Sequence, residues 1–381
     1  MSRSAVRLTE IELHELALPL SEPFIISGGT MTVRRSLVVV LHDDSGHRGY
    51  GESPPFEFPF YSEETLASAR DLLARVLIPR LRSAEVDGPE AVDEMLRRGV
   101  RGNPFARAAL ETAAWDLEAH RRGTGLAALL GERLGLAPAT SIPCGVALGI
   151  PADRSLDTLR RWIDEALPHG YQRVKIKVAP GWDAEAVRAA RRALEGTRIP
   201  LTVDANGGYA WPAHEANLRA LDDEGLLYIE QPLAPEELLG HAHLAQTLRT
   251  PVCVDETLHD ASWGRQLLDL DGPRVWNVKV HRMGGLTEVC RAVRLGRERG
   301  VRLWAGTMPE SGLGSQAALG AAALPGFVLP SDLEPSTRWF GPGVDVIELR
   351  MGTDGTMQVP ATSIAHRLDE SLFRRASRRL H

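Results

Sequence analysis

Length, composition and charge restrict the class of protein first. The chain has 381 residues, of which 43% are hydrophobic and 25% charged, enough for two or three domains of ~100–200 residues each. Its net charge of −6 offers no basic surface for nucleic acid or an anionic membrane. Three scattered cysteines exclude a disulfide framework, and no apolar stretch reaches the ~20 residues of a membrane span. Because the amino-terminal residues lack the unbroken apolar core of a signal peptide, we expect a soluble cytoplasmic protein without nucleic-acid or membrane partners.

Residues 1–135 mix strand and helix signals, and we predict that they form an α+β domain. Residues 36–53 are rich in β-branched residues on both sides of an Asp-Asp-Ser-Gly turn signal, which predicts a hairpin. Residues 104–120 place alanine and leucine on one helical face, and Gly123 is suited to end that helix.

From about residue 136 to residue 330, short apolar runs alternate with amphipathic helical stretches. Eight runs are candidate strands: SIPCGV, VKIKV, LTVDAN, LLYIEQP, VCVDE, VWNVKV, RLWAGT and FVLP. Strand–helix alternation of this kind is typical of parallel strands that close into a (β/α)8-type barrel. An open doubly wound sheet would need a GxGxxG turn after its first strand, which GVALGI does not provide. In the remaining residues, 331–381, DVIEL and GTMQVP resemble strands, and we expect this segment to pack back on the first domain.

Ionisable residues end five successive predicted strands. They are Lys177, Asp204, Glu230, Asp255 and Lys279, at intervals of 27, 26, 25 and 24 residues. Each interval is the length of one strand–helix unit, so the five side chains would meet at the carboxyl-terminal rim of a barrel. Three carboxylates without histidine or cysteine suit a hard cation, Mg²⁺ best and Mn²⁺ or another divalent ion as alternatives. A single strand-end acid is as readily explained by helix capping or pairing with arginine, but three in register are not.

The chain contains only three lysines among its 44 basic residues, at positions 175, 177 and 279. Arginine replaces lysine on a surface but stays protonated, whereas a lysine can lose its proton and act as a base. Lys175 and Lys177 lie two residues apart, so both would face the barrel interior. Their like charge and a neighbouring divalent cation would lower their pKa values, as a general base requires. With Lys279 on the opposite side, this arrangement suits proton transfer at a carbon next to a metal-held carboxylate.

At these residues the sequence resembles the enolase superfamily, specifically the muconate-lactonising subgroup and its N-acylamino acid racemase / o-succinylbenzoate synthase family. The resemblance covers nearly the whole chain and rests on the lysines of VKIKV, on DAN, IEQP and VDE, and on the lysine of NVK. It implies an α/β fold with an N-terminal α+β capping domain over residues 1–135 and a modified TIM-type (β/α)7β barrel over residues 136–330. Residues 331–381 would be a C-terminal segment that returns to the capping domain.

The resemblance also implies a role for each site residue. The metal ligands would be Asp204, Glu230 and Asp255. The acid/base residues would be Lys177 and Lys279, with Lys175 as an electrostatic helper. The residues supporting the metal ligands would be Asn206 and Glu256.

The residues that would bind substrate are inferred from shorter segments, which resemble the family less strongly. The loop 23–30 would form a mobile flap and the segment 54–61 an aromatic rim. The segments WAGTMPESGLG and LPSDLEPSTRWF resemble racemase sequences at and beyond the seventh strand, and Arg282 matches an arginine of racemising members. The candidate substrate-binding residues are Ser27, Gly28, Arg282, Gly306, Thr307, Met308 and Glu310. Val280 and His281 depart from the family, because proline and glycine are usual there.

The resemblance implies Mg²⁺-dependent removal of a proton α to a carboxylate through an enediolate. An isomerase that racemises N-acylated, and particularly N-succinylated, amino acids is the leading hypothesis. The same residues would serve o-succinylbenzoate synthase, a lyase that dehydrates its substrate in menaquinone biosynthesis. Dipeptide epimerase and muconate cycloisomerase match the seventh-strand segment less well.

Two alternatives come from other classes. A Schiff-base aldolase would use Lys279 as a nucleophile without a metal, which the three aligned acids disfavour. A non-catalytic binding barrel would have no need to keep all three lysines and the acids. Under the leading hypothesis, we expect a small-molecule carboxylate substrate and a homo-oligomer.

Overall fold

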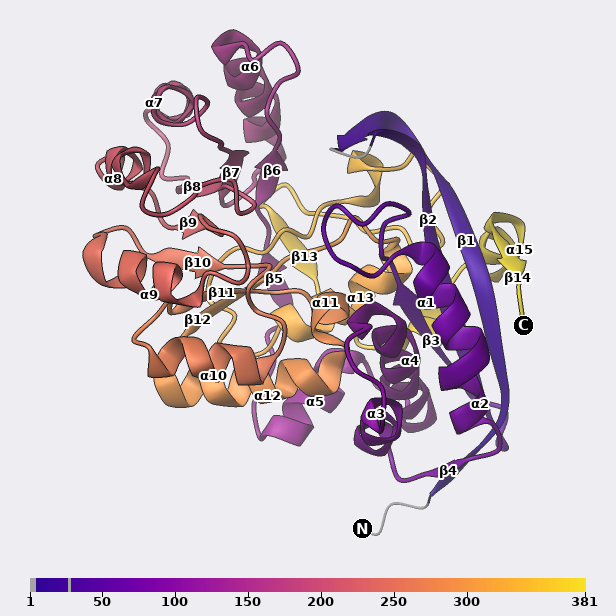
Figure 1. Ribbon diagram of the computed structural model, residues 1–381. Helices are drawn as coiled ribbons and strands as arrows, with labels where there is room; N and C mark the ends of the chain where they lie inside the picture. Colours follow the sequence, from indigo (N-terminus) through magenta and orange to yellow (C-terminus); the bar gives the residue numbers. More distant parts are fainter. Residues whose placement is uncertain (1–4, 27–28) are drawn as a thin grey trace.

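The structure is a computed structural model that describes residues 5–26 and 29–381, and it consists of a cap and a barrel (Figure 1). The cap sheet has the strand order β14-β1-β2-β3, and β4 also pairs with β1. Its strands are β1 (Val6–Ile26), β2 (Gly29–Asp43), β3 (Arg48–Ser53), β4 (Glu85–Val86) and β14 (Ser377–Arg379). The cap helices are α1 (Leu66–Leu72), the π-helical turn η1 (Leu73–Leu77), α2 (Ile78–Leu81), α3 (Pro89–Arg97) and α4 (Pro104–Arg122).

The hairpin and the long helix predicted in the cap are both confirmed. Strands β2 and β3 pair antiparallel, and the Asp43 carboxylate accepts hydrogen bonds from the backbone N–H groups of Ser45 and His47 in the turn. Helix α4 packs directly on β3, where a Cβ atom at Gly51 would lie 2.7 Å from the backbone nitrogen of Ala113. Glycine in β3 therefore lets the helix approach the sheet closely.

Seven of the eight predicted barrel runs, VKIKV to FVLP, lie in a ring of parallel strands. Seven strands form one sheet in the order β12-β11-β10-β9-β8-β7-β6. The named strands are β5 (Ser141–Pro143), β6 (Val146–Leu148), β7 (Val174–Lys177), β8 (Leu201–Asp204), β9 (Ile229–Glu230), β10 (Val252–Val254), β11 (Val275–Val278) and β12 (Arg302–Ala305). The first run, SIPCGV, falls mainly in β5, which pairs antiparallel with a strand of the C-terminal segment, and only its last residue, Val146, begins the ring strand β6. The eighth run closes the ring through parallel bridges from Phe327 to Leu303 and from Ser331 to Cys144.

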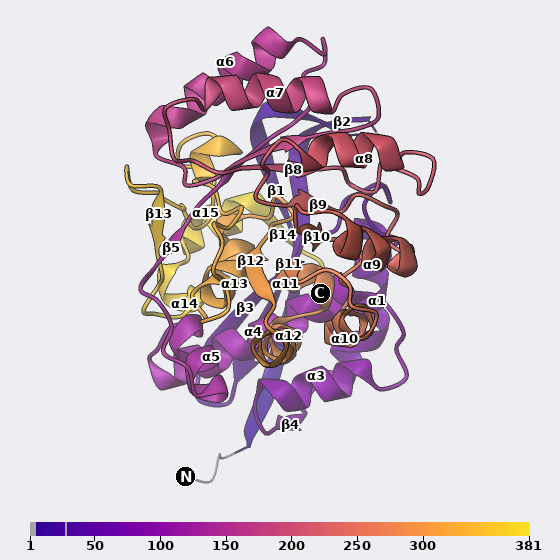
Figure 2. The ribbon, with the colours of Figure 1, turned by 90° about the vertical axis from the view of Figure 1, so that its left-hand side faces the viewer.

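Helices cover the outer face of these strands, and some of them also contact the cap helix α4 (Figure 2). They are α5 (Leu126–Leu134), α6 (Leu156–Ala166), the 3₁₀ turn η2 (Leu167–His169), α7 (Ala184–Ala193), α8 (Glu215–Asp222), α9 (Leu238–Thr247), α10 (Ala261–Asp269), α11 (Val280–Met283), α12 (Leu286–Arg299) and α13 (Gly312–Ala322). Parallel strands with helices on their outer face bury both faces of the sheet, as the apolar strand sequences require. Within the described residues, no helix is both long and apolar enough to cross a membrane.

The C-terminal segment returns to the cap, as predicted, and ends as an extra strand of its sheet. It contains the 3₁₀ turn η3 (Ser336–Arg338), β13 (Thr356–Gln358), α14 (Ile364–Arg367), α15 (Glu370–Ala376) and β14. Strand β14 pairs antiparallel with β1, joining Arg379 to His14 (Figure 1). Strand β13 corresponds to the predicted GTMQVP strand and pairs with β5. The domain boundaries at residues 135 and 330 stay a prediction.

The prediction that DVIEL, residues 345–349, forms a strand is wrong, because the structure has no strand there. Its apolar side chains are buried, but its polar groups bond to side chains and to isolated backbone groups instead of a strand ladder. The Asp345 carboxylate accepts hydrogen bonds from the N–H of Gly312 at 2.9 and 3.0 Å, which caps α13. The N–H of Leu349 donates to the Ser336 hydroxyl at 2.8 Å. The apolar residues of this segment are therefore present because the segment is buried, and not because it is a strand of a sheet.

Helix α4 also joins the cap to the barrel. The Glu111 carboxylate accepts hydrogen bonds from the N–H groups of Leu286 and Thr287, both at 2.7 Å, at the start of α12. Gly285 precedes that helix with φ of 124°, and a Cβ atom there would overlap the Glu111 carboxylate. The largest apolar cluster continues across the same junction, from Leu16 and Trp115 of the cap into the barrel. The cap is thus held against the barrel by both polar and apolar contacts.

We expect Glu111 to make folding stability depend on pH. Burial raises the pKa of Glu111 from 4.5 to about 7, outweighing the hydrogen bonds from Thr287 that lower it. Between these two pH values, the folded chain keeps a proton that the unfolded chain releases, so the free energy of unfolding falls as the pH rises. Because Glu111→Gln has no such proton, the difference in stability between wild type and variant should fall by up to ~1.4 kcal/mol per pH unit in this window.

Equilibrium urea unfolding of both proteins across the same pH window measures this difference. The matched control is Glu94→Gln, since the Glu94 side chain is 78% exposed and its substitution should leave the pH dependence unchanged. A wild-type advantage that stays constant or grows with pH would contradict the expected direction.

Candidate active site

The five predicted strand-end residues lie at the carboxyl ends of five neighbouring parallel strands. Lys177 is directly opposite Asp204, and Asp204 is directly opposite Glu230, in the register of β7, β8 and β9. Asp255 follows β10 and Lys279 follows β11. The structure therefore gathers these residues at one rim, from separate strands, as a barrel active site requires.

Lys177 and Asp204 form one side of the site. The Lys177 Nζ atom donates to Asp204 Oδ2 at 2.6 Å and also to the Asn206 side-chain oxygen. The Asn206 amide in turn donates to Glu256 Oε1 at 2.8 Å, so both predicted supporting residues are in contact with the cluster. Burial opposes the charged form of Asp204, but Lys177 and Lys175 outweigh it and lower its pKa to about 2. Asp204 is thus a carboxylate at any physiological pH.

Lys279 and Asp255 form the opposite side. The Lys279 Nζ atom donates to Asp255 Oδ2 at 2.8 Å and to the Tyr61 hydroxyl at 3.0 Å. Arg282 pairs with the other oxygen of Asp255 and donates to the Tyr61 hydroxyl at 3.1 Å. Tyr61 belongs to the loop before α1, so the cap supplies one wall of the site.

Lys175 lies deeper in the barrel than Lys177. Its Nζ atom is 3.0 Å from Glu230 Oε2, 3.7 Å from Asp204 Oδ2 and 2.5 Å from Asp332 Oδ2. Its side chain is 5% exposed, whereas that of Lys177 is 34% exposed. Of the two lysines on β7, only Lys177 is therefore open to a substrate.

The prediction that like charge and a divalent cation lower the pKa values of Lys175 and Lys177 stays a prediction, and the acids around Lys175 act in the opposite direction. Burial lowers the pKa of Lys175, but the carboxylates of Asp332, Glu230 and Asp204 outweigh it and raise the pKa above its ordinary value. For Lys279, burial is likewise outweighed by Tyr61 and Glu256, and the pKa is raised. The sequence argument counted the neighbouring cations but not the number of acids within contact distance.

The acids provide a donor set that fits a hard divalent cation. Asp204, Glu230 and Asp255 are at most 2% exposed, and they offer only oxygen atoms. Burial, followed by the negative charge of Asp204, raises the pKa of both Glu230 and Glu256. The buried Oε2 atom of Glu256 has no hydrogen-bond partner among the described residues. A cation at this rim would relieve both conditions.

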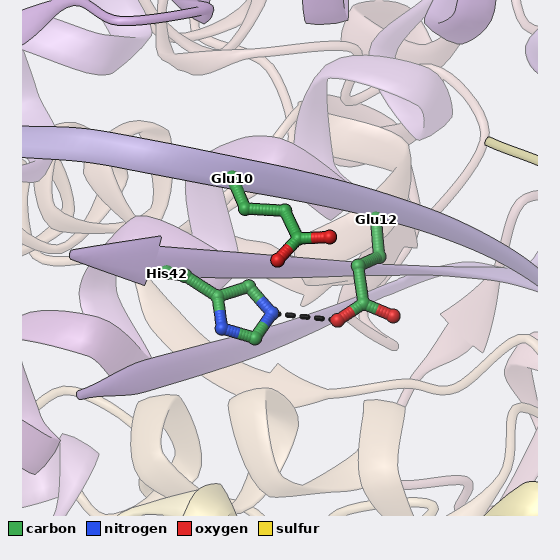
Figure 3. Close-up of side chains that lie close together, drawn as sticks. All are labelled: Glu10, Glu12 and His42. Atoms are coloured by element: carbon green, nitrogen blue, oxygen red, sulfur yellow. Dashed lines mark hydrogen bonds and ion pairs between the residues drawn. The ribbon is translucent and has the colours of Figure 1, made fainter. Parts of the chain in front are cut away.

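A second acidic group, on the cap, is more compact. Glu10, Glu12 and His42 bring candidate ligand atoms within 4.8 Å of one another, the only such set of three among the described residues (Figure 3). Arg379 lies 2.6 Å from Glu10 and 3.3 Å from Glu12, and the His42 ring is 2.7 Å from Glu12. These partners neutralise the acids and Glu10 is exposed, whereas the barrel acids are buried, so we interpret this group as ion pairs of the cap sheet.

The predicted substrate-binding residues have different surroundings. Ser27 and Gly28 lie outside the described residues. Gly306 is adjacent to Asn277, whose amide donates to Glu230 Oε1 at 2.8 Å, and the Thr307 hydroxyl donates to the Asp332 carbonyl at 3.1 Å. These two residues therefore lie beside the charged cluster.

Met308 and Glu310, in contrast, are buried between the barrel and the cap. Met308 packs with Phe56 and Phe105, so the predicted aromatic rim contributes in part to a core cluster. Glu310 accepts a hydrogen bond from the Met308 N–H at 2.5 Å, and burial raises its pKa to about 7. His281 is also buried, which lowers its pKa to about 3 and makes it an unsuitable acid/base group at neutral pH.

Two contact residues were missed by the sequence argument, Tyr61 and Asp332. Asp332 follows the eighth predicted strand, so the strand-end pattern that identified the other acids also applied to it. Tyr61 ends the segment interpreted as an aromatic rim, but nothing local distinguishes it from the phenylalanines before it. Its position depends on the packing of the cap against the barrel.

Comparison with known proteins agrees with this architecture. Residues 9–131 match the mandelate racemase / muconate lactonizing enzyme N-terminal domain, and residues 158–363 match the enolase C-terminal domain-like family. An N-succinylamino acid racemase of Thermus thermophilus is 41% identical over 93% of each chain. An o-succinylbenzoate synthase of Geobacillus kaustophilus is 37% identical over 96% of this chain and 94% of the relative.

Solved structures give the same result. A protein of Enterococcus faecalis, described as an unknown member of the enolase superfamily, superposes with a TM-score of 0.89 at 34% identity. The superposition covers 99% of both chains. The chain therefore belongs to the mandelate racemase / muconate lactonizing enzyme family of the enolase superfamily.

Proposed function

We propose that the protein is a divalent-metal-dependent racemase of N-acylated amino acids, with N-succinyl derivatives as its preferred class. The observation that carries this proposal is the position of Lys177 and Lys279. They end β7 and β11, which are separated by three strands of the ring, and each donates to a different buried carboxylate. Two amines on opposite sides of one site can address both faces of a single carbon atom.

In this proposal, one lysine removes the α-proton as a neutral amine while the other, as an ammonium, delivers a proton to the opposite face. The raised pKa of Lys279 suits the proton donor of such a pair. Asp204, Glu230 and Asp255 would hold Mg²⁺ or a related divalent ion, which supplies positive charge to the carboxylate of the deprotonated substrate. Arg282 would fix Asp255 through its ion pair, while Tyr61 would place the Lys279 ammonium group.

A second candidate is o-succinylbenzoate synthase. It is favoured by the similarity to the synthase of Geobacillus kaustophilus, which extends over 96% of this chain. Here Lys177 would remove the proton and Lys279 would stay protonated as cationic support. The Lys177 ammonium group would then return that proton to the leaving hydroxyl group, which departs as water as the carbon–oxygen bond breaks. The two activities need the same five residues, so one protein can carry both.

Substrate assays in D₂O with added Mg²⁺ test the proposal. We expect N-succinylamino acids to racemise and to acquire deuterium at the α-carbon, more rapidly than their N-acetyl counterparts. The dehydration substrate of o-succinylbenzoate synthase is assayed in parallel. Absence of α-deuterium in every N-acylamino acid would exclude the racemase and leave the synthase to be judged by its product. The expected homo-oligomer and cytoplasmic location stay predictions.

A further inference from the structure

A buried arginine lies beneath the candidate active site. Arg173 precedes β7 and is two residues before Lys175, so Arg173, Lys175 and Lys177 share the inner face of the strand. Its side chain is completely buried, an unusual environment for a permanent charge. It donates to the Tyr228 hydroxyl at 2.6 Å, and its guanidinium carbon lies 4.8 Å from the centre of the Trp304 ring.

The surrounding backbone is shaped around this guanidinium group. A Cβ atom at Gly145 would lie 2.5 Å from the Arg173 Nη2 atom, so glycine leaves the space that the arginine occupies. The counter-charge is Asp332, which pairs with Arg173 through one carboxylate oxygen. Arg173 therefore occupies a site with a dedicated counter-ion and a fitted volume, as expected for a residue whose position matters.

Asp332 connects this arginine to Lys175. One Asp332 oxygen pairs with Arg173, and the other lies 2.5 Å from the Lys175 Nζ atom. The backbone of Asp332 is held in turn, because its N–H donates to the Ala305 carbonyl at 2.9 Å and its carbonyl accepts from the Thr307 hydroxyl at 3.1 Å. The carboxylate is thus fixed both by the closing segment of the barrel and by the arginine.

Lys175 is consequently held among the buried acids. Its Nζ atom contacts Glu230 Oε2 at 3.0 Å and lies 4.8 Å from the centre of the same Trp304 ring that Arg173 covers. Without Asp332, the two adjacent buried cations beside Trp304 would have less compensating negative charge. Without Arg173, the Asp332 carboxylate would lose the partner that sets its orientation.

We propose that Arg173 and Asp332 act as a positioning pair that holds Lys175 against Glu230 and leaves Lys177 as the lysine of β7 that faces substrate. Among the described residues, neither member of the pair forms a hydrogen bond with Lys177 or Lys279. The pair acts through Lys175 and the acids that Lys175 contacts, so its effect on turnover rests on the proposed function. Supporting residues of this kind typically change activity by about 10–100-fold when removed.

The three lysines make the proposal directly measurable. Protein labelled with ¹³C at the lysine ε-carbon should give one NMR signal each for Lys175, Lys177 and Lys279, assigned by single lysine-to-arginine variants. In Asp332→Asn, we expect the Lys175 signal to move by much more than the Lys279 signal, because Asp332 contacts Lys175 directly. We expect kcat to fall by about 10–100-fold with a nearly unchanged KM. Should Asp332→Asn fail to fold, Arg173→Lys, which keeps the buried charge but loses the planar fork, is used with the same two measurements.

The matched control is Asp157→Asn, which removes the acid of an exposed arginine pair on α6 and should change neither the lysine spectrum nor kcat. An unmoved Lys175 signal in the folded variant overturns the positioning pair, and so does a shifted signal with wild-type kcat. If the wild-type protein turns over none of the tested substrates, the proposed function fails. The NMR signals of the lysines then test the proposed role of Arg173 and Asp332 without an activity measurement.

Discussion

Replacing either Lys177 or Lys279 with alanine is expected to abolish racemisation, with a loss of about 10²–10⁴-fold in kcat. The reason is that each lysine serves a different face of the substrate, so neither can substitute for the other. Neither substitution removes an apolar contact of the core, and we expect both variants to keep the wild-type fold. Activity is followed by polarimetry from each pure enantiomer, and folding by circular dichroism and thermal unfolding.

The two variants should differ in a second measurement. With one lysine left, the enantiomer whose α-hydrogen faces that lysine can still exchange it for deuterium, but the product keeps its configuration. Lys177→Ala and Lys279→Ala should therefore retain exchange in opposite enantiomers. The matched control is Arg188→Ala, an exposed cation on α7 that should leave both measurements unchanged. Racemisation that persists in either lysine variant would contradict the two-base mechanism.

Removing the divalent ion, or one of its proposed ligands, should have the second largest effect. We expect exhaustive treatment with EDTA to lower turnover by at least about 100-fold and Mg²⁺ to restore it, because the deprotonated substrate needs compensating charge. Asp255→Asn should weaken Mg²⁺ binding by about 10–100-fold. Isothermal titration calorimetry without substrate measures the dissociation constant directly, independently of activity.

The cap provides a matched control for this experiment. Glu12→Gln alters the compact group of Glu10, Glu12 and His42, which brings possible ligand atoms closer together than the barrel acids (Figure 3). Since these acids already have cationic partners, we expect Glu12→Gln to leave Mg²⁺ affinity and turnover at wild-type levels. Loss of Mg²⁺ binding in Glu12→Gln with full binding in Asp255→Asn would place the metal on the cap and overturn the assignment to the barrel.

The barrel could be predicted from the sequence because its strands are local, short and buried. Runs such as LTVDAN combine β-branched residues with a polar strand end, and they recur at the length of one strand–helix unit. The segment DVIEL carries the same local signal, yet its Asp345 carboxylate binds the N–H at the start of α13 and the segment pairs with no strand. The two segments differ only in what they contact in the folded protein, because LTVDAN lies beside other strands and DVIEL does not.

The candidate site shows a similar division. Lysines and acids at strand ends could be located because position along a strand decides which rim they reach. Their protonation states could not be predicted from the sequence, because the pKa of Lys175 depends on Asp332, which is 157 residues away in sequence. The position of Tyr61 beside Lys279 depends likewise on how the cap meets the barrel. Contacts between distant segments determine both properties.

The pairing of β14 with β1 has a consequence for solubility. The outer edge of β1 would otherwise present a row of free backbone N–H and C=O groups, a ready template for joining the sheet of another molecule. Strand β14 covers His14 to Leu16 on that edge. Arg379 adds charge beside Glu10, which further discourages edge-to-edge association. A chain shortened by its last few residues would lose this protection and become prone to aggregate, although every residue of the candidate active site would still be present.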